Sequence, residues 1–580
     1  MNLFLKTIKK IFLILPQNKV NQFYITCFLL FIQSIIEVIG LGAILPVFLV
    51  ILEPEILQKY DWAKFLYNTL NLSNTNDLII VLTLSLLIFI ILKNALSILI
   101  TKHRIDFALS AYMDIALNIF DDYYYRDYQS FKTNNIAELW RNINQSIYWF
   151  SLGILVPSLT IINEFIIFVL IITFLFFYNF NAIIILTFTT IPIILLITNW
   201  INKTTIILGE RKKEVDPLLL KNYYESILGY VDIVITGSQK FFSNKIKKYI
   251  KKQVNIDLKS MIIGDLPVRS IETSLVFTIT IIIFYGVFTN MNNTEFLSLL
   301  GVVGLAGYRL APTINRISTN LKGIAANSWT TDMVLENINN MISETQKSLN
   351  EKIHFNKSII LDDISFSYDN QEKSTFENLS LEINKGETIG IIGESGSGKT
   401  TLLNILLGFL KQTKGKILID GHELKHSQIA DYRSKISYVN QNLFMIDDSI
   451  ARNVAFGLSD DLIDHKKLKY ALKLANLWKY VKSSKLGINT KVGENGYKLS
   501  GGQRQRIGIA RAIYFDSEIL FFDEATSSLD KETEKKVTKS ITQLSNSNLT
   551  LIIISHNEAS LKYCNRVINI KDCQKKQAST

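Results

Sequence analysis

Six long apolar stretches in the first 330 residues constrain the fold of this chain more than any other feature. Each is long enough to cross the ~30 Å hydrocarbon core of a bilayer, which takes about 20 helical residues. Backbone polar groups in lipid must be paired within their own segment, so we expect each stretch to be a helix. The predicted spans are 24–52, 78–100, 147–177, 183–201, 268–288 and 296–314.

The composition agrees with a chain that lies partly in lipid. Of its 580 residues, 48% are hydrophobic and 19% are charged, against about 25% charged in an average soluble domain. This excludes a disordered chain and a protein that coats nucleic acid, so we expect no nucleic-acid partner. The three cysteines, Cys27, Cys564 and Cys573, have no metal-ligand spacing and indicate neither a disulfide framework nor a zinc site.

The net charge of +11 gives the orientation, because Lys and Arg next to membrane spans favour the cytoplasmic side. Lys6, Lys9 and Lys10 precede the first span, and no small-residue cleavage site follows it, so we expect a cytoplasmic amino terminus and a retained anchor. Residues 53–77 carry a net charge of −2, which suits the outside. Much of the positive charge therefore belongs to cytoplasmic segments.

The two longest polar segments, 101–146 and 202–267, lack the Pro/Gly-rich composition of linkers and predict helices that continue into the cytoplasm. Residues 121–132 and 222–232 are rich in Tyr and charge, which favours a contact element over a solvated bend. On the outside, residues 58–70 have apolar residues at helical spacing. They predict a short amphipathic helix on the outer surface.

Four cations lie inside or at the ends of the spans, all in the predicted cytoplasmic half. They are Lys93, Arg269, Arg309 and Arg316. Ionisable groups in a span are costly and usually face a cavity or a partner. A cytoplasm-facing cavity with these cations would attract an anionic head group, because Arg offers bidentate contacts to phosphate. The alternative is structural: pairing with Glu37, Glu164 or Glu272, or snorkelling to the interface.

From residue 353 the sequence changes to short Ile/Val-rich strands that alternate with helices, as in an α/β domain. The strand 388–392 runs into GESGSGKT, a complete phosphate loop, followed by a helix. We expect its backbone N–H groups to hold the phosphates of ATP, Lys399 to reach the β and γ phosphates, and Thr400 to hold Mg²⁺. The predicted ATP-binding residues here are Gly393, Glu394, Ser395, Gly396, Ser397, Gly398, Lys399, Thr400 and Thr401.

A second apolar strand, 519–523, ends in the two carboxylates Asp523 and Glu524. Carboxylates at the carboxyl end of a buried strand require a functional reason. We expect Asp523 to hold Mg²⁺ and Glu524 to polarise the attacking water.

Between these motifs, the sequence LSGGQ at 499–503 resembles the signature of ABC transporter ATPases. The resemblance implies that Tyr368 stacks on adenine and that Gln441 senses Mg²⁺ and the attacking water. It also implies that His556 contacts the γ-phosphate. The signature residues Ser500, Gly502 and Gln503 would face the phosphate loop of a second chain.

The whole chain resembles an ABC exporter half-transporter. The resemblance implies a polytopic α-helical membrane domain of the type IV, exporter-like fold at 1–330, a linker at 331–352, and an α/β P-loop NTPase domain at 353–580. One phosphate loop and one signature, neither degenerate, imply a homodimer with two ATP sites. We expect a multi-pass protein of a bacterial inner membrane, with both termini in the cytoplasm.

Within that family, three features resemble lipid-linked oligosaccharide flippases: the outer amphipathic segment, the sequence 308–316, and Lys93-Asn94-Ala95, where Lys93 stands in place of Arg. They imply an anionic, polyprenyl-pyrophosphate-linked oligosaccharide as cargo, handled together with membrane lipid. A multidrug, lipid A or peptide exporter stays open as an alternative. So does a nucleotide-gated channel or regulator without turnover.

Overall fold

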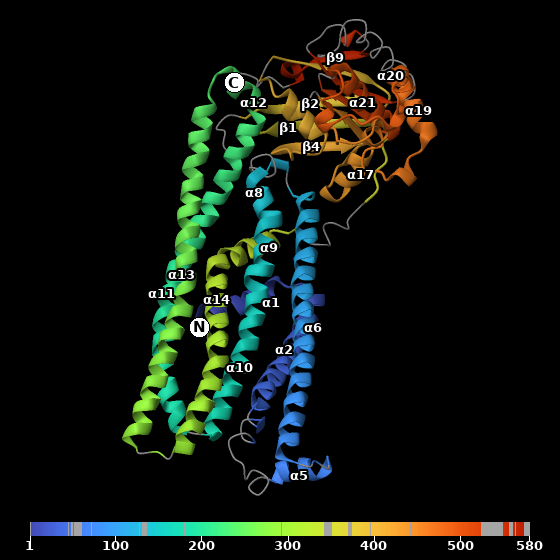
Figure 1. The fold of residues 1–580 in the computed structure, drawn as a ribbon. Helices are drawn as coiled ribbons and strands as arrows, with labels where there is room; N and C mark the ends of the chain where they lie inside the picture. Colours follow the sequence, from blue (N-terminus) through green and yellow to red (C-terminus); the bar gives the residue numbers. More distant parts are fainter. Residues whose placement is uncertain are drawn as a thin grey trace. The chain divides into compact units, whose positions relative to one another are not determined.

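Figure 1 shows the fold in a computed structural model of the chain. The structure describes residues 2–44, 46–47, 50, 61–70, 72, 74–126, 128–129, 136–178, 180–289, 291, 293–341, 351–368, 374–394, 396–440, 443–523, 549–555, 561–562 and 564–573. The chain divides into two compact units. The membrane unit comprises Met1–Tyr125 and Asn134–Met341, and the nucleotide unit comprises Arg126–Thr133 and Ile342–Thr580.

The membrane unit is helical in its described part. Four of its helices have 47 to 50 residues, or about 70 to 75 Å at 1.5 Å per residue. They are far longer than a bilayer is thick, and their extension into the cytoplasm stays a prediction. The helices are α1 (Asn2–Ile14), α2 (Gln17–Gly42), α5 (Asp61–Thr69), α6 (Thr75–Tyr123), α8 (Ile136–Trp140), α9 (Ser146–Phe150), α10 (Val156–Tyr178), α11 (Phe180–Leu228), α12 (Tyr230–Ile235), α13 (Gln239–Phe288) and α14 (Asn293–Asn339), with π-helical turns at Arg141–Gln145 and Ser151–Leu155.

Four helical stretches within the described residues are long and apolar enough to cross a membrane: Gln17–Gly40, Asn76–Tyr123, Glu138–Phe176 and Gln239–Phe288. They overlap the first, second, third and fifth predicted spans. The fourth and sixth predicted spans lie in α11 and α14, which are helical, and their crossing of the membrane stays a prediction. The expected outer amphipathic helix is α5, with Phe65 exposed.

Helix α9, the π-helical turn after it and α10 form one continuous helical stretch that packs at the centre of an apolar core. Ile147, Phe150, Ile154 and Leu155 are fully buried in a core shared with residues of α1, α2, α6 and α14. A second apolar cluster joins α10 to α13 and α14. The third predicted span therefore packs against other helices on part of its surface and exposes apolar side chains such as Phe165 and Phe176 on the rest.

Close packing of α11 on α14 depends on a glycine. A Cβ atom at Gly209 would overlap the backbone carbonyl oxygen of Ala326, which has no flexible end that could move aside. Glycine at this position thus lets two long helices approach each other more closely than any other residue would.

We predict that Gly209→Ala destabilises the membrane unit by about 1 to 3 kcal/mol, the usual cost of overpacking. The measurement is the midpoint of thermal unfolding of the detergent-solubilised protein. Gly304→Ala is the matched control, because a Cβ atom there meets nothing within 4 Å. Since Ala is favoured over Gly in a helix by roughly 0.5 to 1 kcal/mol, the control should lose no stability. Equal effects of the two substitutions would contradict the close approach.

The nucleotide unit contains two sheets. The antiparallel sheet has the strand order β2-β1-β4-β5, and the parallel sheet has the order β6-β7-β8-β3-β9. The strands are β1 (Ser358–Phe366), β2 (Phe376–Asn384), β3 (Thr388–Ile392), β4 (Lys414–Ile419), β5 (His422–Glu423), β6 (Ile436–Val439), β7 (Ile519–Asp523), β8 (Thr550–Ile554) and β9 (Arg566–Asn569). The main helices are α16 (Lys399–Leu406), α17 (Ile429–Ser434), α18 (Ile450–Val454), α19 (His465–Leu474), α20 (Trp478–Ser483) and α21 (Gly501–Tyr514).

The register of the parallel sheet brings the two phosphate motifs to one edge. Ile391 of β3 and Asp523 of β7 both pair with Ile554 of the intervening strand β8. With neighbouring strands ~4.8 Å apart, their Cα atoms are about 10 Å from each other. The predicted α/β P-loop domain is confirmed, with the phosphate loop and Asp523 at the carboxyl ends of buried strands.

Candidate functional site

The phosphate loop connects β3 to α16 and is closed by its own lysine. Lys399 Nζ donates to the carbonyl oxygens of Gly393 at 2.7 Å and Glu394 at 2.9 Å. Gly398, which precedes α16, has φ = 90°, in the left-handed region. A Cβ atom there would also lie 2.9 Å from the Thr375 side chain, so only glycine fits this turn.

The loop has groups that suit an anion. The Ser397 hydroxyl is buried and has no hydrogen-bond partner among the described residues. The start of α16 adds the positive end of a helix dipole. Lys571 Nζ lies 2.8 Å from Glu394 Oε2, and this hydrogen bond lowers the pKa of the Glu394 carboxyl. Lys571 was missed at the sequence level, because no local pattern connects it to the loop.

The structure brings two further predicted residues together beside the loop. The Tyr368 hydroxyl lies 3.1 Å from the Thr401 hydroxyl in the first turn of α16. The Tyr368 ring packs edge-on against Phe366, with ring centroids 4.9 Å apart. Tyr368 is therefore fixed next to the helix that follows the phosphate loop.

Asp523 is oriented by a tyrosine that sequence reasoning missed. Tyr438, in β6, donates its hydroxyl to Asp523 Oδ2 at 3.1 Å. Burial, followed by the charge of Asp523, raises the pKa of Tyr438 well above its ordinary value, so the hydroxyl keeps its proton. The carboxylate of Asp523 and the hydroxyl of Thr400 are oxygen ligands of the kind that Mg²⁺ prefers, together with phosphate oxygens.

The signature sequence forms the start of α21. Ser500 is its N-cap: Ser500 Oγ accepts from the Gln503 backbone N–H at 3.2 Å, and Gln503 Oε1 accepts from the Ser500 N–H at 2.9 Å. This reciprocal pair fixes the first turn and leaves Ser500 exposed at a helix amino terminus. Four predicted site residues, Ser395, Gln441, Glu524 and His556, lie outside the described residues.

One of the two expected contact elements packs within the nucleotide unit. The Tyr128 ring stacks on Phe409, with centroids 5.0 Å apart, and the Arg433 guanidinium lies 4.9 Å from the centre of the same Phe409 ring. At the other element, helix α12 and the residues before it expose apolar side chains. These are Ile227, Leu228, Tyr230, Val231 and Ile235.

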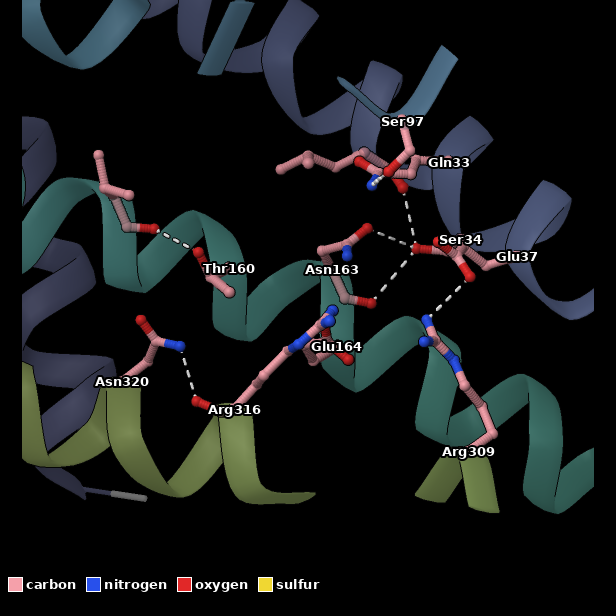
Figure 2. A network of polar contacts seen from close by, with 12 residues as sticks. Gln33, Ser34, Glu37, Ser97, Thr160, Asn163, Glu164, Arg309, Arg316 and Asn320 are labelled. Carbon is pink, nitrogen blue, oxygen red and sulfur yellow. Dashed lines mark hydrogen bonds and ion pairs between the residues drawn. The ribbon is translucent and has the colours of Figure 1, made fainter. Parts of the chain in front are cut away.

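In the membrane unit, Glu37 of α2 joins two of the predicted cations. Its Oε2 atom lies 3.2 Å from Lys93 Nζ of α6. The same atom lies 3.0 Å from Arg309 Nη2 of α14 (Figure 2). All three side chains are less than one-fifth exposed: 13% for Glu37, 17% for Lys93 and 15% for Arg309. The cluster carries one net positive charge.

A polar seam continues along the same helix. Gln33 donates to Ser97 at 2.7 Å, and Ser34 contacts the side-chain oxygen of Asn163 at 3.0 Å (Figure 2). Gln33 and Ser34 lie one helical turn before Glu37, so all three project toward neighbouring helices. Sequence reasoning missed this seam, although polar residues at i and i+4 inside an apolar span could have indicated it.

The other two cations are paired as well. Arg316 Nη1 lies 2.8 Å from Glu164 Oε1, and Glu164 is only 1% exposed. Its second oxygen has no hydrogen-bond partner among the described residues, and Arg104 interacts electrostatically with both members of the pair. Arg269 Nη1 lies 3.2 Å from Glu272 at the exposed i, i+3 spacing. Each of the four predicted cations is thus paired with one of the three glutamates that the sequence offered as partners.

Comparison with known proteins agrees with this arrangement. Residues 376–527 match the family model described as ABC transporter, which implies that the nucleotide unit binds ATP. A solved structure of a bacterial Atm1-family ABC exporter with ATP bound has a TM-score of 0.73 at 22% identity, covering 91% of this chain and 92% of that chain. The chain has the fold of an ABC exporter. This exporter fold combines the helical membrane unit with the P-loop nucleotide unit described above.

Relatives by sequence include proteins named ATP-dependent lipid A-core flippase. The one from Francisella tularensis subsp. holarctica (strain OSU18) is 34% identical over 352 residues, which are 59% of this chain and 56% of the relative. The one from Cupriavidus pinatubonensis (strain JMP 134 / LMG 1197) is 30% identical over 354 residues, with 59% and 58% covered. The match thus spans a little more than half the length of these relatives.

The Arg316–Glu164 and Arg269–Glu272 ion pairs differ in burial, so breaking them should lower the stability of the protein by different amounts. Arg316→Gln leaves the buried Glu164 carboxylate without its arginine and should cost about 3 kcal/mol, the low end for such pairs because Arg316 is itself half exposed. Arg269→Gln breaks an exposed pair and should cost less than about 1 kcal/mol. Thermal unfolding of the two variants measures the difference, and similar midpoints would contradict the burial of Glu164.

Proposed function

We propose that this chain is an ATP-driven exporter that moves an anionic lipid-linked molecule from the cytoplasmic to the outer side of a bacterial inner membrane. The main support is that one chain joins a helical membrane unit to a nucleotide unit with a phosphate loop and a signature helix. In the membrane unit, two cations that are less than one-fifth exposed, Lys93 and Arg309, share the single carboxylate of Glu37. The positive charge before the first span supports a cytoplasmic amino terminus, and six spans would return the carboxyl terminus to the same side.

The proposed ATP site uses residues at the carboxyl edge of the parallel sheet. Lys399 and the loop N–H groups hold the phosphates, and Tyr368 stacks on adenine. Thr400, Gln441 and Asp523 hold Mg²⁺, which when bound neutralises charge on the phosphate oxygens. Glu524 orients and polarises the attacking water, and His556 contacts the γ-phosphate.

Each complete ATP site is proposed to form between two copies of the chain. The phosphate loop of one copy faces Ser500, Gly502 and Gln503 of the other, so the helix amino terminus at Ser500 meets the γ-phosphate. Closure of the two nucleotide units on ATP switches the membrane units between inward and outward access, and hydrolysis resets them. The exposed apolar end of α12 supports a second copy, since large apolar groups gathered on a surface mark contact sites.

The proposed cargo is a polyprenyl-pyrophosphate-linked oligosaccharide, held at its phosphates by Lys93, Arg309, Arg316 and Arg269. One charge cluster supports an anionic head: Glu37 with Lys93 and Arg309 carries one net positive charge. A second candidate cargo is a lipid A type glycolipid, which the names of the sequence relatives favour. Both candidates carry phosphate on a lipid-anchored glycan.

Glu524→Gln should keep ATP binding and lose nearly all ATP hydrolysis, because the amide cannot polarise water as the carboxylate does. Nucleotide binding and phosphate release are measured separately on the purified full chain. Glu423→Gln is the control, since Glu423 is exposed on β5 and pairs with Lys416. Hydrolysis at the wild-type rate in Glu524→Gln would contradict the assignment. A wild-type chain that binds ATP without hydrolysing it would instead favour a nucleotide-gated channel or regulator.

Arg309→Ala should reduce lipid translocation by more than about tenfold and basal ATP hydrolysis far less, because it removes a proposed phosphate ligand that belongs to the membrane unit and not to the nucleotide unit. Flipping is measured in proteoliposomes with a labelled polyprenyl-pyrophosphate-linked oligosaccharide and, in parallel, with labelled lipid A. Faster flipping of one lipid identifies the cargo. Unchanged flipping of that lipid by Arg309→Ala removes Arg309 from the substrate site.

A further inference from the structure

The carboxylate of Glu37 is shared by two cations that come from two other helices, an arrangement that can control which head groups enter. We propose that Glu37 is a built-in counter-anion that occupies the cation pair Lys93 and Arg309 and admits only head groups with two or more negative charges. The inference rests on the proposed export of an anionic lipid and assigns a selecting residue to that site.

Glu37 is the acidic partner of both Lys93 and Arg309. A single oxygen of Glu37 makes both contacts, at 3.2 Å to Lys93 Nζ and 3.0 Å to Arg309 Nη2. Figure 2 shows Arg309 reaching Glu37 from α14. Because one oxygen of Glu37 occupies both cations, a head group can contact Lys93 and Arg309 together only if it displaces the Glu37 side chain.

Arg309 is neutralised without being fully hydrogen-bonded. Its Nε and Nη2 atoms are buried and have no hydrogen-bond partner among the described residues, although Nη2 lies at ion-pair distance from Glu37. The carboxylate therefore screens the charge but does not fill the donor fork of the guanidinium. A phosphate-type head, with several oxygens, satisfies such a fork better than one carboxylate oxygen does.

The helix that carries Glu37 is held in place on both sides of it. One turn earlier, Gln33 and Ser34 bond to α6 and α10. One turn later, Gly40 lies against the stem of Lys93, where a Cβ atom would be 3.2 Å from Lys93 Cδ. With the backbone fixed, an incoming head group displaces the Glu37 side chain rather than the helix.

Counting charges explains the selection. A head group with one negative charge that replaces Glu37 restores the original balance and leaves the Glu37 carboxylate unpaired in a poorly solvated place, so the exchange is unfavourable. A head group with two or more negative charges also neutralises the residual positive charge and can drive the exchange. Glu37 thus acts against phospholipids with one phosphodiester charge, which surround the exporter in large excess.

The test measures lipid binding by the full chain in phosphatidylcholine nanodiscs without ATP. The probes are undecaprenyl pyrophosphate, lipid A and phosphatidylglycerol, which has one negative charge. The wild-type chain should bind phosphatidylglycerol weakly. Glu37→Gln, which frees both cations, should bind it about tenfold more tightly. Asp257→Asn, which removes a carboxylate paired with Lys212 on the helical extensions, is the control and should not change binding.

A charge-restoring variant makes the test independent of the single substitution. Glu37→Gln combined with Lys93→Gln returns the cluster to one net positive charge and leaves Arg309 without a second cation beside it, so phosphatidylglycerol binding should be weaker than in Glu37→Gln alone. Should Glu37→Gln not fold, Glu37→Asp replaces it, because the shorter side chain weakens both contacts and should raise phosphatidylglycerol binding by a smaller factor.

The outcomes separate this inference from the proposed function. Phosphatidylglycerol binding that is equal in the wild type and in the folded Glu37 variant overturns the role of Glu37. A wild-type chain that binds neither undecaprenyl pyrophosphate nor lipid A overturns the proposed cargo, whatever the Glu37 variant does. Binding of lipid A alone supports the selection by charge and assigns the second candidate cargo.

Discussion

Charge inside a low-dielectric interior has to be paired, and in the membrane unit this requirement joins helices that are far apart in the sequence. Arg309 and Arg316 lie two turns apart on one side of α14. One reaches Glu37 on α2 and the other reaches Glu164 on α10. The relative placement of α2, α10 and α14 therefore depends on ion pairs as well as on apolar packing.

In the nucleotide unit, the order of the parallel strands determines where the phosphate loop and Asp523 lie. Parallel strands end at the same edge of a sheet, so the loop after β3 and the carboxylate at the end of β7 meet there. The Tyr438 hydroxyl, contributed by the neighbouring strand β6, then holds Asp523 in one orientation. Tyr128, from the segment between two membrane helices, packs into this unit through Phe409.

Much of the fold follows from local patterns in the sequence. The long helices, the amphipathic α5 and the P-loop domain were all predictable, because apolar periodicity and the phosphate-loop spacing involve residues close together in the chain. The four cations in or near the spans were also visible in the sequence, and their contact with substrate stays a proposal. Their pairing was named only as an alternative, since spacing along the chain says nothing about whether residues 37, 93 and 309 meet. Tyr438 and Lys571 were missed for the same reason.

The sequence by itself determined that this chain has apolar helices and an ATP-type phosphate loop, and it supplied the charged residues in each. Only the tertiary structure decided which charges neutralise one another and which stay in excess. The physical reason is that Coulomb interactions depend on distances in space and on burial. Glu37 is an ordinary acidic residue in the sequence, and it becomes a shared counter-ion only because α2, α6 and α14 bring Lys93 and Arg309 to the same oxygen atom.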